Sequence, residues 1–146
     1  MDETGFVDVA DDLSTGSREA DWRSATSRAY YAAFHKARRF LRHNAFTVPR
    51  AEQARAYLWL RLSNTRHPDV DNAGLELGQL RTARNQADYD VDIPVDHAEC
   101  IDHVQVAVGI IQLLDDLTKE AAILARVLDA IKVYERDVLR EITWHP

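Results

Sequence analysis

The sequence predicts an all-α fold, an antiparallel four-helix up-and-down bundle with an additional C-terminal helix. Apolar residues recur at helical spacing in several separate stretches of the chain. The 146 residues include only 5 Gly and 4 Pro, too few for the many tight turns of an all-β fold. The segments between the periodic stretches are about four to ten residues long, which favours antiparallel neighbours in a bundle.

The expected helices follow from these stretches in chain order. Residues 1–8 are expected to be frayed. Because no Gly or Pro occurs from Ile110 to His145, the last part of the chain forms either one very long helix or two helices with a break near Thr118, and the break is favoured. The helices are expected over about residues 9–13, 21–44, 50–62, 72–90 and 96–118, with a C-terminal helix over about 119–143.

Capping residues support several of these boundaries. Pro49 suits the first position of the helix that follows it. Asn72 is expected to cap the next helix, and Asp96 fits a capping box with Glu99.

The second helix shows the clearest pattern. Asp21 is expected to cap its start and Asn44 its end. Its apolar face comprises Trp22, Ala29, Tyr30, Ala33, Phe34, Ala37, Phe40 and Leu41. Its opposite strip comprises Arg28, Tyr31, His35, Arg38, Arg39 and Arg42.

Composition is that of a soluble globular protein, with 46% hydrophobic and 29% charged residues. The length suits one domain over residues 1–146, with a core over about 10–118 and a helical extension over about 119–143. The single cysteine, Cys100, excludes an intrachain disulfide and the usual cysteine zinc sites. No motif for a metal or a cofactor occurs, so we expect neither.

The sequence gives no sign of secretion or membrane insertion. The first twelve residues are acidic, unlike a signal peptide. The most apolar run, Val104 to Leu114, is too short to span a bilayer and contains two glutamines. We therefore expect a cytoplasmic protein that does not enter a membrane.

Charge is distributed unevenly along the chain, although the net charge is only −6. Residues 36–66 contain eight Lys or Arg and one acidic residue. This basic segment suits a phosphate-bearing partner, and it equally suits the acidic segments of the chain itself or of a second copy.

An arginine stands where the helical pattern calls for an apolar residue. Leu77, Leu80, Arg84 and Ala87 share one helical face, so the Arg84 side chain is expected to point inward. A buried guanidinium stays charged and needs hydrogen-bond partners or an anion. One interpretation is an internal pair with Asp88 at i+4. The other is an anion or phosphate site in a groove.

Two motifs point to a family. They are S-R-A-Y-Y-A-A-F-H-K-A at residues 27–37 and R-N-Q-A-D-Y-D at residues 84–90. Together they resemble the HEPN superfamily (higher eukaryotes and prokaryotes nucleotide-binding), in the subfamily with an R-A-Y-Y-A-x-F helix and an R-x-x-A-D-Y ending. The resemblance covers roughly residues 10–118.

The resemblance implies an all-α bundle that usually dimerises and brings two copies of the arginine motif together in a cleft. Active members are metal-independent endoribonucleases that carry an Arg, a polar residue and then a His, with four to six residues between the Arg and the His. Many prokaryotic members are encoded beside a minimal nucleotidyltransferase, often as toxin and antitoxin. The implied partners are therefore a second copy of the chain, a nucleotidyltransferase, and RNA or a nucleotide.

Carried onto this sequence, the family motif is incomplete. Arg84 matches the motif arginine and Asn85 the polar residue, whereas Tyr89 stands where the shortest motif has its histidine. A tyrosine, with an ordinary pKa of about 10, is a poor base, but it can donate a hydrogen bond to phosphate or act as an acid. The candidate catalytic residues are Arg84 and Tyr89. The candidate ligand-binding residues are Arg84, Asn85, Asp88, Tyr89, Tyr31 and His35.

A histidine from elsewhere in the chain could replace the missing one. His35 shares the polar strip of its helix with Tyr31, and His43 and His67 are further candidates.

Three functions are compatible with these observations. The first is a nucleotide-binding or RNA-binding module that acts as a dimer in a system with a nucleotidyltransferase. The second is an endoribonuclease toxin that uses Arg84 and Tyr89, and the third is a purely structural dimerisation module. The missing histidine favours the first over the second, and the retention of Arg84, Asn85, Asp88 and Tyr89 disfavours the third.

Overall fold

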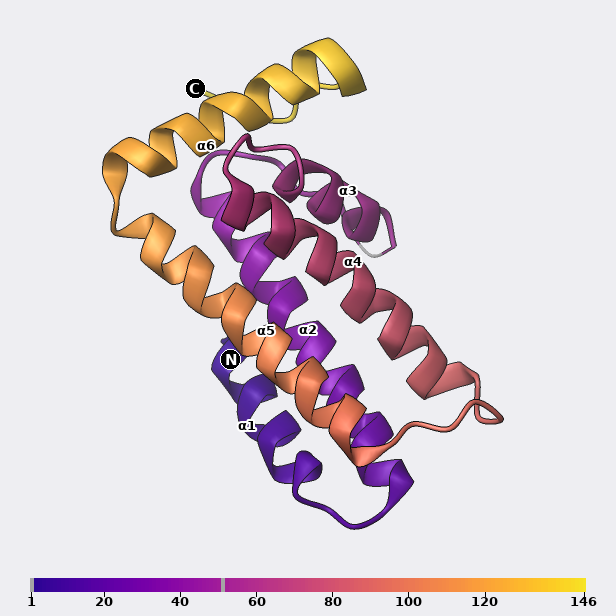
Figure 1. Ribbon diagram of the computed structural model, residues 1–146. Helices are drawn as coiled ribbons and strands as arrows, with labels where there is room; N and C mark the ends of the chain where they lie inside the picture. Colours follow the sequence, from indigo (N-terminus) through magenta and orange to yellow (C-terminus); the bar gives the residue numbers. More distant parts are fainter. Residues whose placement is uncertain (1, 51) are drawn as a thin grey trace. The chain divides into compact units, whose positions relative to one another are not determined.

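Figure 1 shows the computed structural model, which describes residues 2–50 and 52–146. The described residues form α1 (Glu3–Ser14), α2 (Glu19–His43), α3 (Gln53–Leu62), α4 (Pro68–Tyr89), α5 (His97–Thr118), α6 (Ala121–Tyr134) and a π-helical turn, η1 (Glu135–Leu139). In the part of the chain described, extended pairing is limited to one bridge between Phe46 and Trp144. The predicted all-α bundle with an additional C-terminal helix is confirmed.

The chain divides into two compact units, which are described one at a time. Unit 1 comprises Met1–His35 and Glu76–Ile111, and unit 2 comprises Lys36–Leu75 and Gln112–Pro146. Helices α2, α4 and α5 each contribute residues to both units.

Unit 1 is a bundle of α1 with parts of α2, α4 and α5, and successive helices run in opposite directions (Figure 1). Alanines let α2 pack closely, since Ala25, Ala29, Ala32 and Ala33 are at most 1% exposed. Cys100 on α5 is fully buried, and this burial raises the pKa of its thiol.

The start of unit 1 differs from the expectation of a frayed end and a short helix. Helix α1 begins at Glu3, because the Asp2 carboxylate accepts a hydrogen bond from the Thr4 backbone N–H at 3.0 Å and caps it. The Phe6 ring then stacks on the His35 ring, with 5.1 Å between centroids, and ties α1 to α2.

In unit 2, α3 crosses α4 at Gly74. A Cβ added to Gly74 would lie 2.4 Å from the Ser63 backbone nitrogen and 2.5 Å from the Leu62 carbonyl carbon. Only glycine permits this approach of two backbones.

The tail after α6 folds back within unit 2 on a buried ion pair. Arg61 Nε donates to Glu135 Oε2 at 2.7 Å, and both side chains are at most 3% exposed. The Thr143 backbone N–H donates to Glu135 Oε1 at 3.0 Å, and Arg140 turns the chain at a φ of 53°. The regular helix therefore ends at Tyr134, earlier than the expected boundary near residue 143.

Other helix boundaries also differ from the expectation. Helix α2 begins before Asp21, which instead pairs with Arg18 at 3.1 Å. Pro49 precedes α3 without being part of it, and Asn72 lies inside α4, which begins at Pro68. The expectation that α4 begins at Asn72 did not take account of Pro68, which occupies the first position of this helix.

Three expected boundaries are confirmed. Asn44 closes α2, since its side-chain amide donates to the Phe40 carbonyl at 2.8 Å. Asp96 caps α5 by accepting from the Glu99 backbone N–H at 2.7 Å. The break near Thr118 separates α5 from α6. Among the described residues, every helix is too short or too polar to span a bilayer.

Candidate functional site

Arg84 lies in unit 1, in the last turns of α4, and is only 2% exposed. Leu77, Leu80 and Ala87, which share its helical face, are at most 4% exposed. The inward orientation predicted from their spacing is confirmed. A permanent positive charge is therefore built into the interior of unit 1.

Three phenol rings surround this charge. Arg84 Cζ lies 5.5 Å from the centroid of the Tyr30 ring, 5.4 Å from that of Tyr31 and 5.9 Å from that of Tyr89. An aromatic face attracts a cation with about 0.5 to 2 kcal/mol, more when the pair is desolvated. The rings replace part of the hydration that Arg84 lost on folding.

The hydrogen bonding of Arg84 is incomplete. Its Nε and Nη2 are buried and have no hydrogen-bond partner among the residues that the structure describes. Its Nη1 lies 3.8 Å from Asp88 Oδ2, which is too far for a hydrogen bond. Asp88 Oδ2 instead accepts a hydrogen bond from Ser27 Oγ at 3.2 Å. The internal pair is thus a loose ion pair that leaves Arg84 with unused donors.

The end of α4 adds accessible groups beside Arg84. Tyr89 is 72% exposed although its ring faces the guanidinium, and the Asp88 side chain is 31% exposed. Asn85 is partly buried next to Arg84 in the sequence. The side chains of Asp88 and Tyr89 are therefore the solvent-accessible groups next to the buried guanidinium.

Arg23 on α2 fixes this helix end in place. Its guanidinium donates to the carbonyls of Gln86 at 3.2 Å and Ala87 at 3.0 Å in the last turn of α4. The Gln86 carbonyl also accepts from the Asp90 backbone N–H at 3.0 Å. The guanidinium also donates to the carbonyls of Asp90, Val91 and Ile93. Because its side chain is only 13% exposed, Arg23 ties the 86–93 segment to α2.

Tyr31 connects the arginine to a second aromatic group. The Tyr31 and His35 rings are 6.3 Å apart between centroids, and both residues are partly exposed. Of the predicted ligand-binding residues, Arg84, Asp88, Tyr89 and Tyr31 meet around the guanidinium, and His35 lies one ring further out.

The other histidine candidates lie elsewhere. His43 and His67 belong to unit 2, while Arg84 belongs to unit 1.

Sequence reasoning missed two members of the site. Tyr30 was assigned only to the core, and it does lie there at 2% exposure, but its ring also faces Arg84. The sequence does not indicate Arg23, because its partners are backbone carbonyls more than sixty residues away. Every residue has a backbone carbonyl, so the residue types do not show which carbonyls Arg23 contacts.

A guanidinium with unused donors has the chemistry to bind an anion. Among the described residues, no group of three or more His, Cys, Asp or Glu side chains is placed to hold a metal ion. The guanidinium offers a delocalised charge and unused N–H donors, which suit a phosphate or a carboxylate.

The comparison with protein families agrees with the motifs. The model of the HEPN domain matches residues 9–117, and the chain belongs to this family. No curated protein and no solved structure matches the chain.

Proposed function

We propose that the protein binds RNA or a nucleotide through a phosphate group held by Arg84, and that it acts as a dimer. The observation that carries this proposal is the buried guanidinium of Arg84, whose Nε and Nη2 have no hydrogen-bond partner among the described residues. Burying a cation without full pairing is costly, so its presence favours a role beyond packing. Membership of the HEPN family supports the choice of RNA or a nucleotide as the anion.

Asp88 is expected to affect how tightly a phosphate binds to Arg84. Its carboxylate lies 3.8 Å from Arg84 Nη1, and the Asp88 side chain is 31% exposed. An incoming phosphate would therefore compete with Asp88 for the same positive charge. Tyr89 can support the phosphate with a hydrogen bond from its exposed hydroxyl.

A dimer would place this site at an interface. Tyr89 and Val91 are each 72% exposed and Ile93 is 47% exposed, an unusual run of large hydrophobic side chains beside the site. HEPN domains commonly dimerise. We propose that the 89–93 segment meets its counterpart from a second copy and brings two Arg84 sites together.

Binding is favoured over RNA cleavage. Metal-free cleavage needs a base for the 2′-hydroxyl proton and an acid for the leaving oxygen. The rings around Arg84 are phenols, whereas the side chain that suits both roles is the imidazole of histidine. A nucleotidyltransferase partner in a toxin–antitoxin-like system is compatible with this proposal and rests on the family resemblance.

The test is binding of a fluorescein-labelled single-stranded RNA, measured by fluorescence anisotropy at one fixed low salt concentration. Arg84→Met is expected to weaken binding by about tenfold or more, because it removes a charge-assisted contact. Asp88→Asn is expected to strengthen binding, since it removes the competing charge and keeps an acceptor for Ser27.

Arg28→Met is the matched control, because Arg28 is an exposed arginine on the same α2 strip as Tyr31. Equal affinities for the wild type, Arg84→Met and Arg28→Met would refute an Arg84 site. Absence of binding in the wild type together with unfolding of Arg84→Met would favour the purely structural function.

Induced expression separates binding from cleavage. Growth arrest with broken RNA, lost in both Arg84→Met and Tyr89→Phe, would identify an active ribonuclease. Intact RNA in cells expressing the wild type supports the binding module.

A further inference from the structure

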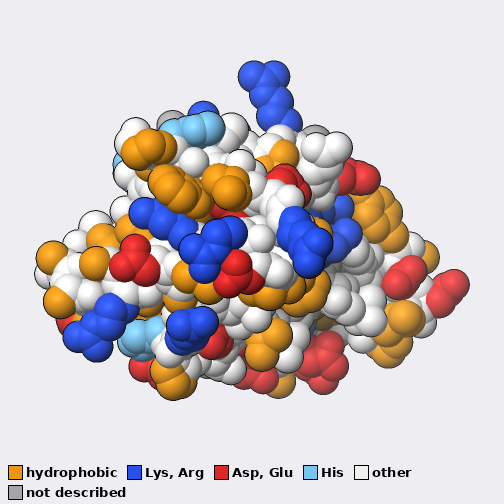
Figure 2. All heavy atoms as spheres, turned by 90° about the horizontal axis from the view of Figure 1, so that it is seen from above, with side chains coloured by type: hydrophobic (Ala, Val, Ile, Leu, Met, Phe, Trp, Pro, Cys, Tyr) orange, Lys and Arg blue, Asp and Glu red, His pale blue; other side chains and the backbone are white. Residues whose placement is uncertain are grey.

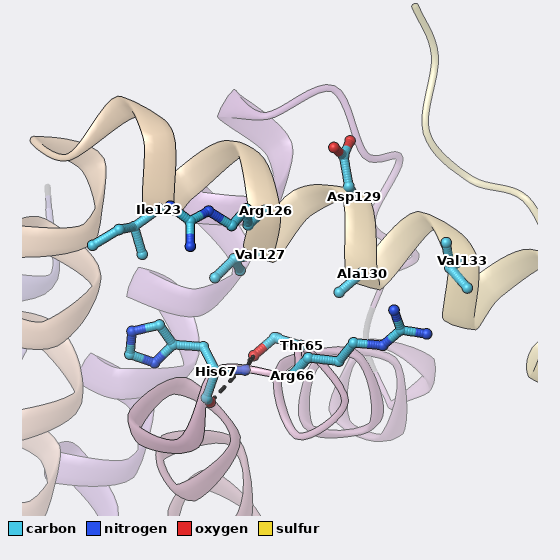
Figure 3. Close-up of a pocket in the computed structure, with 9 residues that line it drawn as sticks. All are labelled: Thr65, Arg66, His67, Ile123, Arg126, Val127, Asp129, Ala130 and Val133. Carbon is cyan, nitrogen blue, oxygen red and sulfur yellow. Dashed lines mark hydrogen bonds between the residues drawn. The ribbon is translucent and has the colours of Figure 1, made fainter.

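Unit 2 contains a half-open pocket of about 510 Å³ between α6 and the connection from α3 to α4. Figure 3 shows its two walls, α6 on one side and residues 65–67 on the other. This volume lies within the range of about 300–1,000 Å³ that is typical of small-molecule sites. Helix α6 lies beyond the match to the HEPN family at residues 9–117, so the pocket depends on a part of the chain that the family does not account for.

The α6 wall of the pocket is apolar. Ile123, Val127, Ala130 and Val133 follow one another along a single face of α6 and all line the pocket. Val127 is 1% exposed and Ala130 is 8% exposed, so they form the buried floor of the pocket. This floor suits the apolar body of an organic molecule.

The ends of the pocket are basic. Figure 3 shows Arg126 and His67 at the Ile123 end and Arg66 toward the Val133 end, whereas the Asp129 carboxylate points away from residues 65–67. On the face that Figure 2 shows, several Lys and Arg side chains lie near the middle, with Asp or Glu side chains among them and hydrophobic side chains beside them.

Arg126 is the arginine at the Ile123 end of the pocket. Among the described residues, Arg126 has no hydrogen-bond or ion-pair partner. Arg66 differs, because it has an acidic residue nearby. The pKa of Asp137 is lowered mainly by its hydrogen bond with Arg136 and also by the positive charge of Arg66. Arg126 is therefore the cation of the pocket that remains available to pair with an anion.

His67 can assist Arg126 as a donor. Its Nδ1 accepts a hydrogen bond from the Val70 backbone N–H at 3.4 Å, at the start of α4. A neutral imidazole that accepts at Nδ1 carries its hydrogen on Nε2, which can donate to an anion.

We propose that this pocket binds a small organic anion with an apolar body. Arg126 and His67 hold its carboxylate, sulfonate or phosphate group, and Val127 and Ala130 support its body. The proposal is independent of the Arg84 site, which belongs to unit 1.

The test uses two fluorescent probes that share an aromatic body. 8-Anilino-1-naphthalenesulfonate carries a negative charge, and N-phenyl-1-naphthylamine has the same rings without it. Titrations use the full chain, and circular dichroism checks that each variant is folded. The variants are Arg126→Ala, Arg126→Gln, Ala130→Leu and the control Arg28→Ala, which removes an exposed arginine that does not line the pocket.

The sulfonate is expected to bind at one site and to lose about tenfold in affinity, or about 1.4 kcal/mol, in both Arg126 variants. The uncharged probe is expected to bind more weakly and to be unaffected by these variants. Ala130→Leu fills the floor and is expected to weaken both probes, whereas Arg28→Ala changes neither. Amide NMR shifts on adding the sulfonate are expected at residues 65–67 and 123–133.

Other results would overturn the proposal. Equal affinity for the two probes would refute a site for anions, and insensitivity to Ala130→Leu would refute this pocket. Octanoate and phenyl phosphate then identify the preferred anion by competition. Displacement of the sulfonate by either one supports the proposal, and displacement by neither overturns it.

Discussion

The environment of Arg84 does not favour the stability of the folded protein. Its guanidinium is 2% exposed, lies among three phenol rings and leaves two donors without hydrogen-bond partners in the described part of the chain. Burying a cation whose donors lack partners costs desolvation free energy, and an apolar side chain of similar size does not carry this cost.

We therefore predict that Arg84→Met raises the free energy of unfolding by about 1 kcal/mol or more. Urea denaturation followed by circular dichroism measures this change. Leu80→Met, a change of similar size on the same buried face, is the control and is expected to cost less than about 1.5 kcal/mol. A loss of stability in Arg84→Met larger than in the control would make Arg84 a structural residue.

The sequence predicted the position of Arg84 better than its surroundings. Its burial followed from the spacing of Leu77, Leu80 and Ala87 on one helix, which is a local property. The approach of Tyr30 depends on how α2 packs against α4 in unit 1, and no spacing within one helix contains that information.

At the scale of the elements, the end of α4 depends on a side chain from α2. Arg23 donates to carbonyls of the 86–93 segment and pairs with Glu19 at 2.9 Å. Lysine keeps the charge, but it has a single nitrogen and cannot reproduce this spread of donors.

We predict that Arg23→Lys lowers the free energy of unfolding by about 1–3 kcal/mol and speeds amide hydrogen exchange in residues 86–93. Exchange measured by mass spectrometry locates the effect. Arg18→Lys is the control, because the Arg18 side chain is 77% exposed and its pair with Asp21 contributes little. Unchanged exchange at 86–93 in Arg23→Lys would show that the segment is held by other contacts.

The helix boundaries that were wrong have different causes at the starts and at the C-terminal end. Expected starts at Asp21 and Asn72 relied on residues that favour caps, but both lie inside helices. The expected end near residue 143 relied on an apolar stripe, whereas the buried Glu135 carboxylate draws Thr143 back and leaves Ile142 59% exposed. At the C-terminal end, the buried pair of Glu135 with Arg61, which is distant in the sequence, overrides the local apolar pattern.

At the scale of the whole molecule, the proposed dimer makes a clear prediction. Sedimentation equilibrium is expected to give twice the chain mass of 16.6 kDa at micromolar concentration. The double variant Val91→Glu with Ile93→Glu places charges in the proposed interface and is expected to give monomers. The matched variant Val138→Glu alters an exposed residue of unit 2 and is expected to remain dimeric. A wild type that stays at 16.6 kDa would contradict the dimer.

The buried state of Cys100 has a practical consequence. The thiolate is the form that reacts with alkylating reagents, and burial both hides this sulfur and raises its pKa. A cysteine introduced at an exposed position such as Val9 would therefore react with a nitroxide spin label, whereas Cys100 would stay unlabelled. In a symmetric dimer, such a protein carries one spin per subunit, and pulsed electron resonance would report a single distance between them.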